Sequence, residues 1–250
     1  MVELLETPLL SIIIPAHDEE HRLPQTLKKI SAFLAAQPYQ AEVLVVENGS
    51  NDATLAIAEQ YAQQEASIHV MHLARSGKGL AVREGMLAAQ GEYRFICDAD
   101  LSMPIEEVNK FLPPVLSDFD VAIASREAPG AKRYDEPAYR HLIGRVFNTL
   151  VRLVALPGLQ DTQCGFKCFH APVAEKVFRL QTFEGWSFDV EVLYIALMLG
   201  YKIIEVPINW YHIPGSRVKL FRDSARMAMD IMAIRQNAKC GLYNEQKSVD

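Results

Sequence analysis

The triplet Asp98-Ala99-Asp100 places two carboxylates one residue apart, directly after an apolar run at residues 93–97. If that run is a strand, both side chains emerge at its end. Oxygen ligands suit Mg²⁺ or Mn²⁺, which complete their coordination with water and phosphate oxygens. The triplet therefore predicts a divalent-cation site, although carboxylates in this position can also cap a helix.

A second group, Ser76-Gly77-Lys78-Gly79, precedes a helix expected at residues 79–89. Backbone amides and Lys78 at a helix N-terminus could face an anion. The group is not a P-loop, because Leu80 stands where Ser or Thr would follow. No G-x-G-x-x-G follows the first strand, which counts against a dinucleotide oxidoreductase. The alternative for Lys78 is a solvated lysine at the start of a helix.

Short apolar strands alternate with amphipathic helices in the first half, which predicts an α/β fold with a parallel sheet. The expected strands are residues 9–14, 43–46, 68–73, 93–97 and 121–124, and the expected helices are 23–36, 52–64, 79–89 and one starting at Pro104. Polar residues follow each strand: His17, Asp18 and Glu19; Glu47 and Asn48; Arg75 to Lys78; Asp98 and Asp100; Ser125 and Arg126. Ligands bind at this edge of such sheets, so these residues are expected to line one cleft.

The second half is less regular. It predicts helices at residues 136–155, 172–178, 188–199 and 220–238, a compact stretch at 161–169 and a late strand at 203–206. A chain of 250 residues fits one large domain with a short appendage. We expect residues 1–214 to form the domain, and residues 215–250 to be an amphipathic helix and tail packed on it.

Composition excludes several classes. The formal net charge of −6 argues against a nucleic-acid binder, because phosphate backbones attract basic surfaces. Residues 1–8 are acidic without an apolar core, so we expect no secretory signal and a reducing cytoplasmic setting. Cys164 and Cys168 lack a second Cys/His pair at zinc-site spacing. The most apolar stretch, residues 142–159, is interrupted by two arginines and a proline, which argues against a membrane span.

The last helix carries a charge opposite to that of the whole chain. Residues 217–240 hold six basic and two acidic residues, a local charge of +4. Apolar residues in the same segment are Leu220, Phe221, Met227, Ile231, Met232 and Ile234. Basic and apolar faces together predict an interfacial helix on anionic lipid. The alternative is a helix that packs in the core or forms a homodimer.

Four segments resemble, in order, the signature of family-2 glycosyltransferases: residues 14–20 (IPAHDEE), 47–52 (ENGSND), 77–79 (GKG) and 98–100 (DAD). Residues 161–167 (DTQCGFK) and 186–191 (WSFDVE) resemble the polyprenyl-phosphate branch of that family. This branch includes dolichyl-phosphate glucosyltransferases and dolichyl-phosphate mannose synthases. The similarity covers roughly residues 9–235.

The resemblance implies a GT-A fold with a mixed, mostly parallel sheet, and an inverting hexosyl transfer that depends on Mg²⁺ or Mn²⁺. It implies a nucleotide-diphosphate sugar as donor, UDP-glucose or GDP-mannose, and a polyprenyl phosphate at the cytoplasmic face of a membrane as acceptor. Mannose synthases of this kind often have Gln where this chain has Ser102, which favours glucose. The family usually has two aspartates where this chain has Glu47 and Asn48.

By position, the resemblance also assigns roles to residues. The donor site would comprise Pro15, Glu19, Glu47, Lys78 and Asp98, and the metal ligand would be Asp100. The catalytic set would be Asp98, Asp100 and Asp189. The acceptor phosphate would contact Arg126, Arg140 and Arg217. Arginine suits the last role because its fork binds phosphate oxygens bidentately. Lys132 and Arg133 add positive charge nearby.

A lipid phosphate is already ionised near neutral pH, so transfer to it requires no strong general base. We therefore expect Asp189 to position substrates; a base and a structural carboxylate are its alternatives. Three other functions stay open: a soluble family-2 enzyme that glycosylates a small molecule or glycan, a catalytically silent binding protein, and a sugar-nucleotide pyrophosphorylase. The last is disfavoured because its glycine-rich N-terminal loop is missing.

Overall fold

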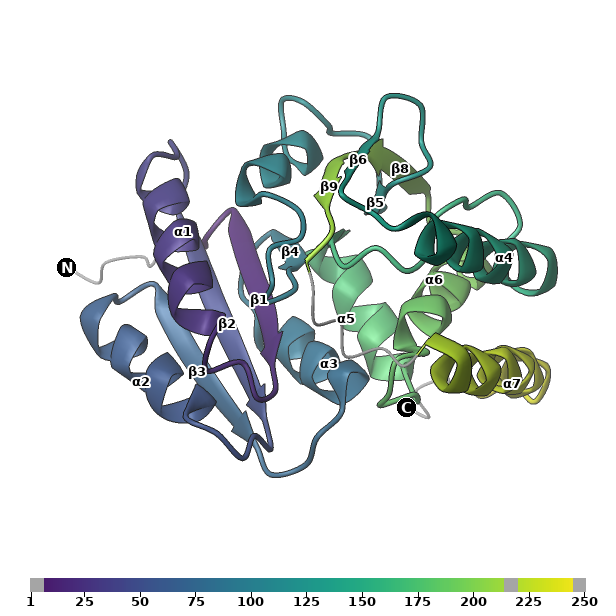
Figure 1. Cartoon of the computed structure of the whole chain (residues 1–250), viewed down its shortest axis with the longest axis horizontal. Coiled ribbons are helices and arrows are strands. Elements are labelled where there is room, and N and C mark those ends of the chain that lie inside the picture. The colour runs from purple at the N-terminus through teal and green to yellow at the C-terminus, as the bar shows by residue number, and fades with distance from the viewer. Residues whose placement is uncertain (1–6, 214–219, 245–250) are drawn as a thin grey trace, which may run out of the picture.

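The structure is a computed structural model that describes residues 7–213 and 220–244. The described residues form a seven-stranded sheet in the order β3-β2-β1-β4-β7-β5-β8 and a two-stranded sheet of β6 and β9 (Figure 1). The strands are β1 (Leu10–Ala16), β2 (Ala41–Asn48), β3 (Ile68–Leu73), β4 (Tyr93–Ile96), β5 (Val121–Ser125), β6 (Lys132–Tyr134), β7 (Lys167–His170), β8 (Ile203–Pro207) and β9 (Asn209–Tyr211).

The helices are α1 (Leu23–Ala35), α2 (Thr54–Gln64), α3 (Lys78–Ala88), α4 (Ala138–Val154), α5 (Ala171–Leu180), α6 (Phe188–Met198) and α7 (Leu220–Lys239), with a 3₁₀-helix η1 (Ile105–Phe111). All five strands expected in the first half are present, as is the late strand. The helix expected after Pro104 is the 3₁₀-helix η1.

The sheet is mixed and mostly parallel, as predicted. Strands β1, β2, β3 and β4 pair in parallel, and so do β5 and β8. Strand β7 lies antiparallel between β4 and β5. Strand β7 falls partly within the compact stretch at 161–169 and was not predicted, because it is short and begins with a lysine.

Strand β1 continues through Pro15, where we expected it to stop. Its pairing with β4 ends at Ile13, whereas its pairing with β2 continues to Ala16. Proline is tolerated where a ladder no longer needs its N–H. The extra residues carry the chain to the carboxyl edge of the sheet, where Pro15 and the residues after it face the site.

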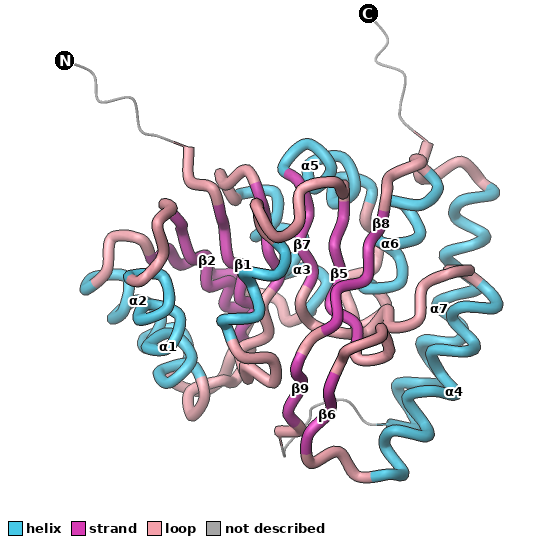
Figure 2. The backbone as a smooth tube through the Cα atoms, turned by 90° about the horizontal axis from the view of Figure 1, so that it is seen from above, coloured by secondary structure: helices cyan, strands magenta, loops and turns pink. Residues whose placement is uncertain are grey.

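Both faces of the sheet are covered, because side chains alternate along each strand. On β1, Ile12 and Ile14 pack in one core with α1 and η1, while Ile13 packs in the other with α3, α5, α6 and α7. These two cores fix the strands whose ends carry the polar residues. Figure 2 shows how the helices surround the sheet.

Helix α7 packs against the domain with part of its apolar surface. Met227, Ile231 and Ile234 are buried, whereas Met229 and Met232 are 67% and 60% exposed. The expectation that Met227, Ile231 and Ile234 face lipid is therefore wrong: Ile231 and Ile234 pack in the core beneath the helix, and Met227 is buried as well. None of the helices within residues 7–213 and 220–244 combines the length and apolar character needed to cross a bilayer.

Candidate functional site

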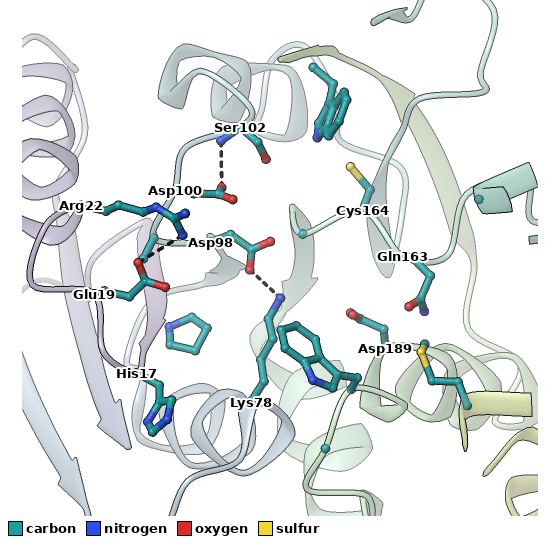
Figure 3. Close-up of a pocket in the computed structure, with 18 of the residues that line it drawn as sticks. His17, Glu19, Arg22, Lys78, Asp98, Asp100, Ser102, Gln163, Cys164 and Asp189 are labelled. Atoms are coloured by element: carbon teal, nitrogen blue, oxygen red, sulfur yellow. Dashed lines mark hydrogen bonds and ion pairs between the residues drawn. The ribbon is translucent and has the colours of Figure 1, made fainter. Parts of the chain in front are cut away.

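A cavity of about 500 Å³ opens at the carboxyl edge of the sheet (Figure 3). Strand-end residues line one part of it: Pro15, His17, Glu19, Asn48, Lys78, Asp98, Asp100 and Arg126. Residues from the second half line the rest: Arg133, Asn148, Gln163, Cys164, Trp186, Asp189, Trp210 and Met227. The predicted cleft is thus present, and the ends of β1, β2, β4 and β5 contribute to it, as does the segment between β3 and α3. Four residues of the expected set do not line it: Asp18, Glu47, Arg75 and Ser125.

Lys78, at the start of α3, is held in the middle of the cavity. Its Nζ lies 2.7 Å from Oδ1 of Asp98 and 5.2 Å from the ring centroid of Trp186. Burial alone would lower the pKa of Lys78, but the charges of Asp98, Asp189 and Asp100 raise it above its ordinary value. Lys78 is therefore a charged, enclosed ammonium and not a solvated lysine.

Asp100 follows Asp98 into the same cavity. The backbone N–H of Ser102 donates to its Oδ1 at 3.0 Å, and Leu101 between them has a φ of +47°, a conformation that few non-glycine residues adopt. Burial and the charge of Asp98 raise the pKa of Asp100. Two carboxylates that repel each other in this way would be stabilised by a cation between them.

The donor set fits a hard divalent cation that shares its ligands with a substrate. Among the described residues, no group of three or more His, Cys, Asp or Glu side chains is placed to hold a metal. Asp98 and Asp100 supply oxygen ligands alone, which leaves the remaining positions for water and phosphate oxygens, as Mg²⁺ and Mn²⁺ prefer.

Gly165, in the loop before β7, packs against Asp98. A Cβ at this position would lie 1.9 Å from Oδ2 of Asp98, far closer than atoms in contact can approach. A larger residue at this position would therefore force the Asp98 carboxylate to move. The loop thereby limits where the Asp98 side chain can lie.

Of the two carboxylates predicted for the donor site after β1 and β2, only one lines the cavity. Glu19 lines the cavity, and its backbone N–H donates to Oγ1 of Thr54 at 2.7 Å. Glu47 is 1% exposed and contacts Ser50 and His72, while the adjacent Asn48 lines the cavity. Burial raises the pKa of Glu47, but the hydrogen bonds from Ser50 and His72 lower it by more. The pKa of Glu47 therefore lies below its ordinary value. Glu47 therefore shapes the loop after β2.

Asp189, in the first turn of α6, is paired with Lys167, a buried lysine that sequence analysis did not single out. Nζ of Lys167 lies 2.5 Å from Oδ1 of Asp189 and 2.6 Å from the carbonyl oxygen of Cys164. Lys167 is fully buried on β7. The available signal was a lysine directly before the apolar pair Cys168-Phe169. This contact holds the Asp189 side chain in one position at the cavity wall.

Arg126 reaches the cavity but is also bound by a buried carboxylate. Its Nε and Nη2 donate to Asp161 at 2.7 and 2.9 Å, and its guanidinium lies 5.4 Å from the ring of Trp210. Burial would lower the pKa of Arg126, but Asp161 raises it. Burial would raise the pKa of Asp161, but Arg126 lowers it to about 2.

The other predicted acceptor arginines are less fully described. Arg133, from β6, lines the cavity and is held by Glu136 at 2.7 Å. Arg140 lies in the first turn of α4, and its side chain is outside the description. Arg217 lies outside the described residues. Of the predicted cationic set, Arg126 and Arg133 are thus brought together at one cavity.

Comparison with known proteins identifies relatives along most of the chain. The family model described as "Glycosyl transferase family 2" matches residues 11–178. A dolichyl-phosphate beta-glucosyltransferase of Drosophila melanogaster is 36% identical over 90% of this chain and 74% of its own length. The Homo sapiens protein of the same name is 32% identical over 97% and 79%.

Solved structures resemble the fold. Mannosyl-3-phosphoglycerate synthase from Rubrobacter xylanophilus has a TM-score of 0.68 at 16% identity, covering 97% of this chain and 78% of its own. Glucosyl-3-phosphoglycerate synthase from Mycobacterium tuberculosis, solved with Mn²⁺ and UDP-glucose, has a TM-score of 0.62 at 18% identity, covering 94% and 79%. At these identities the likeness concerns the fold alone.

Proposed function

This chain belongs to glycosyl transferase family 2, and on that premise we propose that it transfers glucose from UDP-glucose to a polyprenyl phosphate at a membrane surface, inverting the anomeric carbon. One observation carries the proposal. Asp98, Asp100 and Lys78 share a cavity with Arg126 and Asp189, in a chain 36% identical to a dolichyl-phosphate beta-glucosyltransferase. A site for an anionic donor thus adjoins cations for an anionic acceptor.

Asp98 and Asp100 would hold Mg²⁺ or Mn²⁺ together with the donor diphosphate. The bound cation would neutralise charge that develops on the departing nucleoside diphosphate. The raised pKa of Asp100 supports this assignment. So does the Mycobacterium tuberculosis neighbour, which was solved with Mn²⁺ and UDP-glucose.

The side chains of this protein would then position the two substrates. Lys78 would meet the diphosphate at the N-terminus of α3. Asp189, fixed by Lys167, orients the sugar and acceptor. An oxygen of the lipid phosphate forms a bond to the anomeric carbon while the bond from that carbon to UDP breaks. The acceptor oxygen is already ionised, so no residue needs to remove a proton.

Positive charge at the acceptor end would come from Arg126 and Arg133. Asp161 accepts hydrogen bonds from Nε and Nη2 of Arg126. We therefore expect Arg126 to bind phosphate through Nη1. Arg140 and Arg217 stay predictions from the sequence. Together these cations would offset the repulsion between an anionic donor and an anionic acceptor.

Membrane contact would come from α4 and α7, which lie side by side (Figure 1, Figure 2). Exposed apolar residues on the two helices include Leu150, Leu153, Met229 and Met232. Exposed basic residues on the same helices are Arg145, Arg152, Arg235 and Lys239. We call these eight residues the α4–α7 patch. Such a surface fits anionic lipid; a homodimer is the alternative, and the cytoplasmic face stays a prediction.

The test is transfer itself. The purified chain is incubated with Mn²⁺, a polyprenyl phosphate and either UDP-glucose or GDP-mannose, and the lipid product is identified by mass. We expect a hexosyl phospholipid from UDP-glucose. A product from GDP-mannose alone would instead support the mannosyl alternative. Transfer only to soluble sugars or glycans would contradict the lipid acceptor.

A further inference from the structure

Two carboxamides in the cavity wall have buried polar atoms without a hydrogen-bond partner in the described part of the chain. They are Oδ1 of Asn148, on α4, and Nε2 of Gln163, in the loop before β7. Asn148 is only 9% exposed. Buried polar groups are almost always hydrogen-bonded, so unpaired ones inside a cavity indicate a ligand that supplies the missing bonds.

The chemistry of the two amides limits what that ligand is. Oδ1 of Asn148 accepts a hydrogen bond and Nε2 of Gln163 donates one. A phosphate dianion has acceptor oxygens only, so it would face Oδ1 of Asn148 unfavourably. A hydroxyl group both donates and accepts, and can therefore pair with either amide. The two amides therefore match a neutral polyhydroxy group better than they match the donor diphosphate or the acceptor phosphate.

The position of Gln163 agrees with this choice. Figure 3 shows Gln163 and Asp189 facing each other on one side of the cavity, with His17 and Glu19 on the other and Asp98 and Lys78 between them. If the nucleotide occupies the side of His17 and Glu19 and its diphosphate meets Lys78, the hexose reaches the side of Gln163.

We propose that Asn148 and Gln163 bind hydroxyl groups of the donor hexose and determine which sugar the enzyme accepts. The inference rests on the proposed function, because it needs a nucleotide-sugar donor in this cavity. It assigns the two residues to the sugar, separately from the carboxylates and Lys78 that would hold the diphosphate. A site that pairs with hydroxyls rejects sugars whose hydroxyls point elsewhere, because its amides are then left unpaired.

The test compares binding of UDP-glucose with binding of UDP, both by calorimetry with Mn²⁺ present. We expect Asn148→Leu and Gln163→Met each to weaken UDP-glucose about tenfold, the effect of one lost hydrogen bond and one unpaired group, and to leave UDP within about twofold. In transfer assays the preference for UDP-glucose over UDP-galactose should fall. Neither variant should lower Tm, because Oδ1 of Asn148 and Nε2 of Gln163 have no hydrogen-bond partner among the described residues.

The matched control is Thr162→Val, beside Gln163. Oγ1 of Thr162 is also buried and unpartnered among the described residues, but Thr162 does not line the cavity. Its variant should bind UDP-glucose and UDP as the wild type does. If Asn148→Leu does not fold, Gln163→Met carries the test alone.

Equal weakening of UDP and UDP-glucose, or no weakening of either, would overturn the inference. So would a wild type that binds UDP and UDP-glucose equally, since the sugar would then make no net contact. If the wild-type protein binds neither UDP nor UDP-glucose, the result refutes UDP-glucose as the donor instead. In that case GDP-mannose and GDP form the corresponding pair, and the same variants decide whether the amides bind its sugar.

Discussion

Nζ of Lys167 lies 2.5 Å from Oδ1 of Asp189, and both side chains are almost completely buried. The ion pair links β7, in the middle of the sheet, to the first turn of α6 at the cavity wall. Removing one partner of such a pair leaves the other charge buried and uncompensated. The position of Asp189 therefore depends on a residue that does not line the cavity.

Lys167→Met should accordingly lower the free energy of unfolding by about 3–5 kcal/mol, measured by urea denaturation. Adding Asp189→Leu to it should restore much of that loss, because no unpaired charge remains. Transfer should be lost in both proteins. A double variant as unstable as the single one would show that the two side chains are not coupled.

Asp100→Asn should abolish transfer while the protein stays folded. Because burial and Asp98 raise the pKa of Asp100, the ionised carboxylate destabilises the metal-free fold as pH rises through that pKa. The variant should therefore be at least as stable as the wild type at neutral pH without metal. Added Mn²⁺ should raise the Tm of the wild type only. Full activity of the wild type in excess EDTA would refute the metal site.

Gly165→Ala should reduce transfer by two orders of magnitude or more, an effect of about 2.7 kcal/mol, because the new methyl group displaces the carboxylate of Asp98. The control is Gly185→Ala, where a Cβ would meet nothing within 4 Å. Activity and metal-dependent Tm shift are measured for both. Similar losses in the two variants would point to loop flexibility in place of the contact with Asp98.

The Arg126–Asp161 pair should make stability depend on acid. The pKa of Asp161 is lowered from 3.8 to about 2, so its contribution is present above pH 4 and is lost as pH falls toward 2. The loss amounts to about 2 kcal/mol. Asp161→Asn should flatten that part of the pH profile of unfolding, and an unchanged slope would contradict the pairing.

The α4–α7 patch should bind anionic vesicles. Leu153→Glu with Met232→Glu should abolish co-sedimentation, and charge reversal at Arg152 and Arg235 should weaken it most at low salt, where electrostatic attraction is least screened. The control is Val115→Glu, an equally exposed apolar residue, 67% accessible, on another part of the surface. Equal pelleting of all variants would favour a dimer or a purely structural role.

The parts of the site that follow consecutive parallel strands could be predicted from sequence. Apolar runs ending in Asp98 or Arg126 reveal both the strand and the edge where ligands bind. The rest depended on tertiary contacts. A lysine at the start of β7 argues against a buried strand when the sequence is considered alone. Lys167 can be buried there only because it pairs with Asp189, some 22 residues away. Likewise, both Ile231 and Met232 of α7 are apolar, so composition alone could not predict that Ile231 faces the core while Met232 faces outward.

The insertion of β7 between β4 and β5 has a consequence for synthesis of the chain. Strands β4 and β5, which end next to Asp98 and Arg126, do not pair with each other; each pairs with β7. A nascent chain that has just completed β5 therefore exposes an unpaired edge of β4, the kind of edge that invites wrong pairing. Only when residues 167–170 leave the ribosome can one event close the sheet, seat Gly165 against Asp98 and bring the two halves of the cavity together.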